Sequence, residues 1–281
     1  MKQKIVNSLK KLTTNFFNLI YFSKAGRVIV DTVSTNAMNR EVIVKYKNND
    51  FIFTSPNSLN KWRLETFSTK EPETLNWIDG LDNDSILWDI GANIGLYSVY
   101  AAKVKNCKVY SFEPSVFNLE LLARNAFLNG LSDKISIIPL PLTTSIGINK
   151  LNMTSTEWGG AISTFGSKAI GHDGKIMNKT FEFSTLGISM DSAVEVLNIP
   201  VPDYIKMDVD GIEHFILMGG EKVLRKIKGI IIEINDDFIE QDQTASKLLQ
   251  QCGMRLDKKL HSDIIDKMEE FGRTYNQIWV R

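Results

Sequence analysis

Cysteine is scarce in this sequence, and its few cysteines form no motif. The 281 residues include 2 cysteines, Cys107 and Cys252, which are far apart and belong to no Cys-x-x-Cys pair. A zinc ribbon, a thioredoxin-like redox motif and a small disulfide scaffold are therefore excluded. Such cysteine usage is typical of a reducing compartment, so we expect a cytoplasmic protein.

Net charge and long apolar runs are also missing. The 33 Lys and Arg balance 33 Asp and Glu. With no nucleic-acid motif in addition, we expect no nucleic-acid partner. The nearest approach to a membrane span, residues 16–22, is too short and is interrupted by Asn18. At 43% hydrophobic residues, the chain is not disordered and can bury the core of one large domain or two small ones.

The first thirty residues are basic and contain no acid. Their cations are Lys2, Lys4, Lys10, Lys11, Lys24 and Arg27. Apolar residues recur among them at helical spacing, at Ile5, Leu9, Leu12, Phe16, Leu19 and Ile20. This pattern predicts an amphipathic helix. Such a helix packs on its own domain or on a second subunit, or it lies on an anionic membrane. Residues 1–24 are thus expected to make a homo-oligomer contact or to hold the protein peripherally at the inner membrane surface.

The remaining sequence divides into two patterns. Residues 41–54 alternate β-formers around Asn48-Asn49-Asp50, which predicts a hairpin within an α+β lead-in over residues 1–80. Residues 81–281 alternate short apolar runs with helical stretches, including one helix at 213–225, which predicts an α/β fold with a Rossmann-like parallel sheet and helices on both faces. A polar, Gly-rich interval at 143–190 is too long for a simple connection and is expected to help form a substrate site.

A glycine-rich turn lies between an apolar strand and a helix. It reads Asp89-Ile90-Gly91-Ala92-Asn93-Ile94-Gly95. Gly91, Asn93 and Gly95 tolerate positive φ and let a ligand approach the backbone. Glu113 ends the next strand, where an acid accepts hydrogen bonds from both hydroxyls of an adenosyl ribose. Position 96 holds leucine instead of the third glycine of a dinucleotide fingerprint, so the sequence favours a cofactor without phosphate, such as S-adenosylmethionine.

Four blocks follow one another along residues 70–240. They are Glu71-Pro72-Glu73 with Trp77-Ile78; Asp89 to Gly95; Phe112-Glu113-Pro114 followed by Asn118, Leu121-Leu122, Asn125 and Asn129-Gly130; and Ile205-Lys206-Met207-Asp208-Val209-Asp210-Gly211 with Glu213. In this order they resemble the FkbM-type S-adenosylmethionine-dependent methyltransferases. The resemblance implies a class I methyltransferase fold and methyl transfer to oxygen on a sugar, a polysaccharide precursor or another secondary metabolite. Asp210 stands where the family usually has Glu, which keeps the charge and shortens the reach.

The expected cofactor-binding residues are Asp89, Gly91, Asn93, Gly95, Glu113 and Pro114. Transfer to a hydroxyl also needs a positioned base, and in doubly wound sheets ligands bind beyond the carboxyl ends of the strands. Asp208 is the first choice for this base, with a hydrogen bond to backbone as its alternative role. Glu213 is the second choice, and its alternative role is that of a first-turn acid favoured by the helix dipole.

Three other hypotheses remain open at this stage. A divalent ion would take ligands from Asp208 or Asp210 and from Glu233, Asn235 or Asp236, but no dedicated metal spacing is present and no metal is assigned. A nicotinamide-dependent oxidoreductase is disfavoured by the missing third glycine. A non-catalytic scaffold is disfavoured by the intact turn and Glu113. Trp158 is either a wall over a small-molecule or glycan acceptor or a hairpin tip packed on the sheet.

Overall fold

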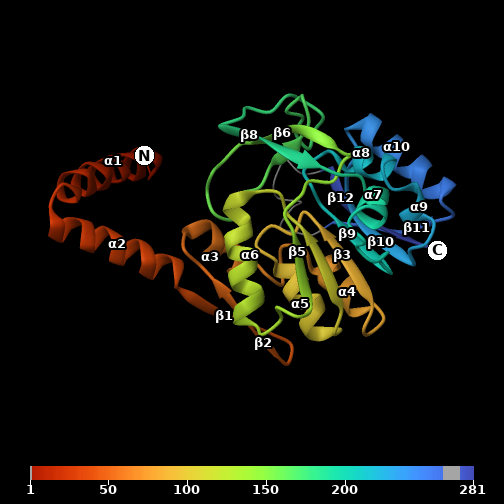
Figure 1. The fold of residues 1–281 in the computed structure, drawn as a ribbon, viewed down its shortest axis with the longest axis horizontal. Helices are drawn as coiled ribbons and strands as arrows, with labels where there is room; N and C mark the ends of the chain where they lie inside the picture. Colours follow the sequence, from red (N-terminus) through yellow and green to blue (C-terminus); the bar gives the residue numbers. More distant parts are fainter. Residues whose placement is uncertain (1, 262–272) are drawn as a thin grey trace.

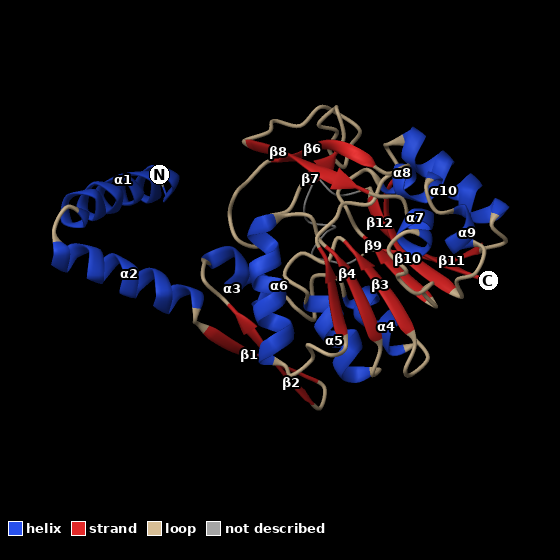
Figure 2. Ribbon diagram, in the orientation of Figure 1, coloured by secondary structure: helices blue, strands red, loops and turns tan. Residues whose placement is uncertain are grey.

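The computed structural model describes residues 2–261 and 273–281, which are built around a seven-stranded sheet (Figures 1 and 2). The strand order is β11-β12-β10-β9-β3-β4-β5. The parallel part comprises β10 (Gly229–Asn235), β9 (Tyr204–Met207), β3 (Ile86–Ile90), β4 (Lys108–Phe112) and β5 (Ile135–Ile138). At one edge, β12 (Thr274–Val280) pairs antiparallel with β10, and β11 (Arg255–Leu260) pairs antiparallel with β12. The predicted α/β class with a Rossmann-like sheet is confirmed.

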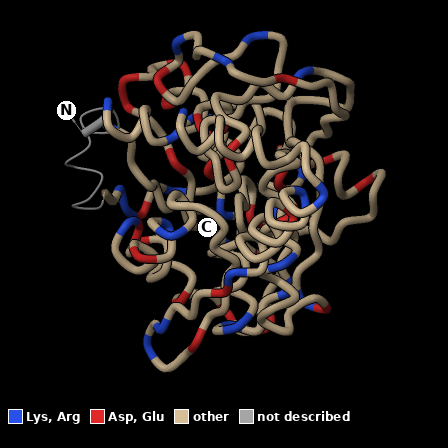
Figure 3. Tube along the Cα trace, turned by 90° about the vertical axis from the view of Figure 1, so that its left-hand side faces the viewer, with Lys and Arg blue, Asp and Glu red and all other residues tan. Residues whose placement is uncertain are grey.

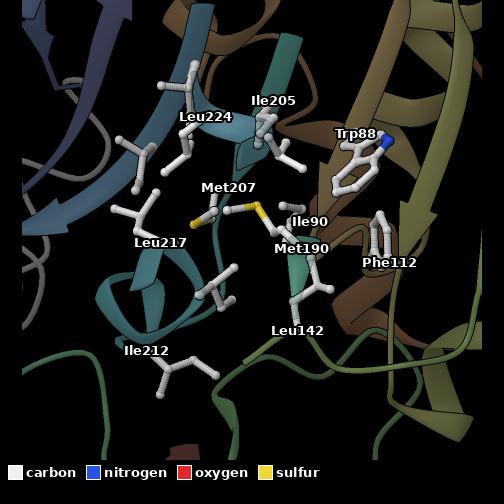
Figure 4. Close-up of a cluster of buried hydrophobic side chains, with 14 of the residues drawn as sticks. Trp88, Ile90, Phe112, Leu142, Met190, Ile205, Met207, Ile212, Leu217 and Leu224 are labelled. Atoms are coloured by element: carbon white, nitrogen blue, oxygen red, sulfur yellow. The ribbon is translucent and has the colours of Figure 1, made fainter. Parts of the chain in front are cut away.

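Helices cover both faces of this sheet, as predicted. Alternate residues of a strand point to opposite faces, so Trp88 and Ile90 of β3 pack in one core cluster and Leu87 packs in the other. Figure 4 shows the first cluster, which lies against α7 (Met190–Glu195), α8 (Glu213–Met218), α9 (Glu221–Leu224) and α10 (Ile239–Gln251). The second lies against α4 (Pro72–Asp79), α5 (Leu96–Val104) and α6 (Val116–Leu128).

The single helix predicted over residues 213–225 is wrong, because the structure breaks it into α8 and α9 at Gly219-Gly220. Glycine is a poor helix former, and here both glycines also permit close contacts. A Cβ on Gly219 would lie 2.4 Å from the carbonyl oxygen of Thr143, and one on Gly220 would lie 1.9 Å from Cε of Met190. The break therefore lets the chain pack closely against α7 and against the loop at Thr143, between β5 and β6.

The amino-terminal segment contains two helices, a hairpin and a third helix. They are α1 (Lys2–Tyr21), α2 (Lys24–Met38), β1 (Glu41–Tyr46), β2 (Asn49–Thr54) and α3 (Ser58–Glu65). The hairpin is confirmed, but Tyr46 pairs with Asn49, so the turn lies one residue earlier than predicted, at Lys47 and Asn48. Phe51 and Phe53 are fully buried in the same cluster as Leu87 of β3. The hairpin thus shares a core with the sheet, and the predicted boundary at residue 80 stays a prediction.

The interval predicted to be an insertion forms a small sheet of its own. β6 (Gly147–Met153) pairs antiparallel with β7 (Ser163–Phe165) and with β8 (Phe181–Gly187). Phe165 and Leu151 line the same cavity as the residues that follow β3, β4 and β9. The small sheet therefore covers the carboxyl ends of the central strands.

Candidate active site

A cavity of about 330 Å³ lies between β3 and β9. At this point the strand order reverses, because β4 and β5 follow on one side of β3 and β9 lies on the other. These two strands are parallel neighbours, with Ile90 opposite Met207. The residues that follow each strand therefore emerge side by side, as the sequence predicted for Asp208 and the glycine-rich turn. Of the predicted site residues, the cavity is lined by Gly91, Asn93, Glu113, Pro114 and Asp208.

The turn after β3 has the predicted backbone conformation. Gly91, Asn93 and Gly95 adopt φ values of 80°, 50° and 82°. The Gly91 amide donates to the carbonyl of Phe112 at 3.0 Å, which ties the turn to the end of β4. A Cβ on Gly91 would lie 1.8 Å from the Asp208 carbonyl oxygen, so only glycine permits the ends of β3 and β9 to approach this closely. Gly95, at the start of α5, does not line the cavity. It packs against Leu122 of α6.

Glu113 links the turn to the next strand. Its carboxylate accepts the Asn93 amide at 2.7 Å and the Ser115 amide at 2.7 Å. Burial raises the pKa of this carboxyl to about 7, although both amides act in the opposite direction. Since each carboxylate oxygen has two lone pairs, acceptor capacity remains for ribose hydroxyls on the cavity side. Pro114, Leu140 and Leu142 add an apolar surface beside it.

Asp89 lies beneath the cavity instead of lining it. Its side chain is fully buried, accepts the Ser98 hydroxyl at 2.6 Å and lies 3.4 Å from the Lys206 ammonium. Lys206 in turn lies 3.5 Å from Asp208 and donates to the Gly91 carbonyl at 3.2 Å. Burial lowers the pKa of Lys206, but Asp208 and Asp89 more than offset this and raise it, so the ammonium stays charged. Lys206 thus joins β3, the turn and Asp208.

A second group of charges faces Asp208 from the amino-terminal segment. Lys70 pairs with Glu71, whose other carboxylate oxygen accepts the Tyr97 hydroxyl at 2.9 Å. Burial alone would raise the pKa of Glu71, but the paired Lys70 lowers it to about 2. Glu233 of β10 lines the same cavity, and burial together with Asp208 and Glu71 raises its pKa well above its usual value. One end of the cavity is therefore polar and rich in carboxylates.

Asp210, where the family usually has Glu, also lines the cavity. Its carboxylate accepts the Ile162 amide at 2.7 Å and the Ser163 amide at 3.4 Å, which holds the insertion against the loop after β9. Burial and the neighbouring Asp208 raise its pKa. The shorter aspartate thus connects two segments of the cavity wall, the loop after β9 and residues 162–163.

Glu213 does not reach the cavity. Its carboxylate accepts the Val209 amide at 3.0 Å and the Gly211 amide at 3.1 Å, and Gln241 donates to it. The residue is 1% exposed, and burial raises its pKa to about 7. Its contacts make it a support for the loop that carries Asp208, and its predicted role as an alternative base stays a prediction.

Glu213→Gln is expected to reduce the pH dependence of stability. The folded chain binds a proton at Glu213 up to about pH 7, whereas an unfolded glutamate binds it only to about its usual 4.5. The free energy of unfolding therefore falls as the pH rises through this window, with Glu113 acting in the same direction. Guanidinium denaturation across this window should show a shallower slope for the variant. The exposed-residue variant Glu221→Gln should keep the slope of the original chain, and an unchanged slope in Glu213→Gln would contradict the assignment.

Three residues that the sequence does not predict for the site also line the cavity. They are Lys70, Tyr97 and Lys206. Lys206 did carry a signal, because a lysine inside an apolar parallel strand is rarely buried without a partner. Lys70 carried none, since it follows a polar loop. Trp158 does not line the cavity. Its carbonyl accepts the side-chain amides of Asn57 and Asn60, so this tip packs on α3, and the wall is instead formed by residues 160–163.

Of the five candidate metal ligands, Asp208, Asp210 and Glu233 line the cavity, and the metal hypothesis stays a hypothesis. Asp236 pairs with Lys259, and the Asn235 amide donates to the His172 carbonyl at 3.2 Å, so both side chains are engaged away from Asp208. Among residues 2–261 and 273–281, no group of three or more His, Cys, Asp or Glu is placed to hold a metal ion.

The site fits an adenosyl cofactor. The fit rests on Gly91, whose lack of a Cβ lets the ends of β3 and β9 meet at the cavity, and on Glu113 beside the apolar surface of Pro114 and Leu140. A Rossmann-like sheet with this loop and acid defines an enzyme with a nucleotide-type cofactor. Residues 89–275 match the family described as the methyltransferase FkbM domain. The chain belongs to this family and is an S-adenosylmethionine-dependent methyltransferase. This family membership contradicts both the oxidoreductase hypothesis and the scaffold hypothesis.

Relatives of known function extend this comparison. The chain is 26% identical over 250 residues to the hexuronic acid methyltransferase AglP of Haloferax volcanii, covering 87% of this chain and 93% of the relative. It is 34% identical over 80 residues to the ribosomal protein arginine N-methyltransferase rmt3 of Schizosaccharomyces pombe, covering 28% of this chain and 14% of that one. Among solved structures, it is similar to the precorrin-6y C5,15-methyltransferase of Geobacter metallireducens, with 13% identity, a TM-score of 0.44, and coverage of 75% of this chain and 86% of the other.

Proposed function

We propose that this methyltransferase acts on oxygen, at a hydroxyl of a sugar, a polysaccharide precursor or a similar small molecule. The observation that carries the proposal is the carboxylate-rich end of the cavity, where Asp208, Glu233 and Glu71 face one another. Carboxylates accept hydrogen bonds from hydroxyls and can remove a hydroxyl proton. The hexuronic acid methyltransferase of Haloferax volcanii, which matches most of the chain, supports a carbohydrate acceptor.

Within this proposal, the cofactor is held at the other end of the cavity. S-adenosylmethionine supplies an electrophilic methyl group for an in-line displacement. Glu113 would bind the ribose hydroxyls, and Gly91, Asn93 and Pro114 line the cavity beside it. Asp89 and Gly95 support this surface from beneath, Asp89 through Lys206 and Gly95 through the start of α5.

Asp208 is the proposed base because it lines the cavity and its side chain is 27% exposed. The Lys206 ammonium, at 3.5 Å, orients the carboxylate. The acceptor hydroxyl can then give its proton to Asp208 as the methyl group is transferred. Glu213 contributes by holding the amides of Val209 and Gly211, which fixes the loop after Asp208.

Asp208→Asn is expected to lower kcat by about 10²-fold to 10⁴-fold, because the amide cannot accept the proton. The experiment first screens neutral sugars, uronic acids and nucleotide sugars for formation of S-adenosylhomocysteine and of an O-methylated product identified by mass spectrometry. The variant is then compared on the best acceptor with Asp133→Asn, an exposed control. Calorimetry with S-adenosylmethionine should show binding in all three proteins.

Two results would count against these proposals. Retained kcat in Asp208→Asn would remove this residue from the role of base. Methylation of amine or carbon acceptors with no hydroxyl product would contradict oxygen as the methyl-accepting atom.

We also propose that residues 1–24 contact a membrane surface or a second copy of the chain. Support comes from the exposed apolar side chains of α1, among them Leu12 and Leu19.

A further inference from the structure

The helices α1 and α2, here called the arm, form a projection at the amino-terminal end of the chain. In Figures 1 and 2 they meet at their connection, far from the central sheet, and diverge from that point. α1 contacts α2, and its apolar residues are left exposed instead of packing on the catalytic domain. The arm is joined to the rest of the chain at Asn39, whose side chain accepts a hydrogen bond from Arg124 of α6 at 3.2 Å.

The arm exposes an unusual amount of apolar surface. Along α1 the exposed residues recur every three or four positions and so share one face of the helix. They are Ile5 (55% exposed), Leu9 (58%), Leu12 (69%), Phe16 (58%) and Leu19 (75%). Phe22 in the connection is 85% exposed, and α2 adds Val28, Ile29 and Val33, each at least half exposed. An exposed apolar helix face of this kind marks an interaction site.

The two helices do not bury this face against each other. Ser23 caps α2 by accepting the Gly26 amide at 2.9 Å, and a Cβ on Gly26 would lie 1.7 Å from the Ile20 carbonyl oxygen. The helices therefore meet closely through backbone at their connection. Phe17 and Ile20 are half-buried, whereas the face with Leu12 and Phe16 stays open to solvent.

The charged residues of the arm are mostly basic, and Asp31 of α2 is its single acid. Residues 1–30 contain no Asp or Glu. Within the described part of the chain, no ion pair joins Lys4, Lys10, Lys11 or Lys24 to an acid. Arg27 is used structurally, donating to the carbonyls of Tyr21 and Phe22 at the end of α1. Figure 3 shows the charges from the side on which the arm projects. A second copy of the arm would bring lysines near lysines, whereas anionic lipid offers the complementary charge.

We propose that the arm binds the surface of a membrane that contains anionic phospholipid. The apolar face of α1 and the adjoining residues of α2 enter the boundary between headgroups and acyl chains, and the lysines contact the headgroups. No helix of the described residues is long and apolar enough to cross a membrane. This inference narrows the proposed contact of residues 1–24 to one partner. Membrane binding is measured without methyl transfer, so this inference can fail while the catalytic proposal stands.

The test is co-sedimentation of the full chain with vesicles of pure phosphatidylcholine and with vesicles in which about a quarter of the lipid is phosphatidylglycerol. The two arm variants are Leu12→Glu/Phe16→Glu, which charges the apolar face, and Lys10→Glu/Lys11→Glu, which reverses the basic side. Matched controls outside the arm are Phe127→Glu, at a 74% exposed residue of α6, and the exposed Lys226→Glu. Binding of S-adenosylmethionine by each variant checks that the catalytic fold is intact.

We expect the original chain and both controls to bind the anionic vesicles, with binding that weakens as salt is added. Each arm variant should lose about tenfold or more in its partition coefficient. Equal binding to both kinds of vesicle, or arm variants that bind as well as the original chain, would overturn the proposal. A third result would also overturn it. If the original chain fails to bind vesicles and light scattering shows a dimer that Leu12→Glu/Phe16→Glu abolishes, the partner of the arm is a second copy of the chain.

Discussion

Gly91→Val is expected to abolish measurable binding of S-adenosylmethionine, a loss of more than about 100-fold in affinity. The residue has a φ of 80°, which a β-branched side chain strongly disfavours. Its Cβ would lie 1.8 Å from the Asp208 carbonyl oxygen, so β3 and β9 would have to separate at the cavity. Both the cofactor surface and the proposed base would move. Isothermal calorimetry with S-adenosylmethionine measures the effect.

Gly130→Ala is the matched control for this variant. Gly130 also has a positive φ, 67°, but a Cβ there meets no atom within 4 Å. It therefore has the backbone strain without the collision, and its affinity should match that of the original chain. Circular dichroism establishes whether Gly91→Val remains folded. Unchanged affinity in Gly91→Val and in Glu113→Ala would contradict the assignment of the cofactor site.

Lys206→Met is expected to destabilise the fold by about 3–5 kcal/mol at neutral pH. Lys206 is 4% exposed and lies 3.4 Å from Asp89, which is fully buried. Without the ammonium, Asp89 would keep its Ser98 hydrogen bond but would have an unpaired negative charge in the interior. Guanidinium denaturation of the two proteins measures the difference in the free energy of unfolding.

Two further variants separate this effect from a general effect of removing lysine. Lys228→Met removes a 52% exposed lysine that lies 2.8 Å from Asp82 and 3.2 Å from Asp203, and it should reduce stability much less than Lys206→Met does. Lys206→Met/Asp89→Asn should recover part of the loss, because the uncompensated charge is removed as well. A loss in Lys206→Met no larger than that in Lys228→Met would show that the buried pair is not important for stability.

Several structural features followed from local sequence. The alternation of apolar runs with helical stretches predicted the parallel sheet, because strands covered on both faces must be apolar throughout. The positions of Gly91, Asn93 and Gly95 predicted a turn with positive φ, since few other residues adopt that conformation readily. Strand β11, by contrast, was not predicted. It is an edge strand whose residues 255–259 are all exposed, so its sequence lacks the apolar pattern that identifies a strand.

The order of the motifs along the chain therefore determined the fold class, the cofactor turn and the placement of Asp208 at the end of a strand. These features depend on backbone preference and on periodicity within a few residues. The tertiary structure alone decided which charges meet. Lys206 pairs with Asp89 from a strand more than a hundred residues away, and Lys70 and Glu71 reach the cavity from a segment before the matched domain. It also decided that the apolar face of α1 is left open, because burial depends on which surfaces the folded chain brings together.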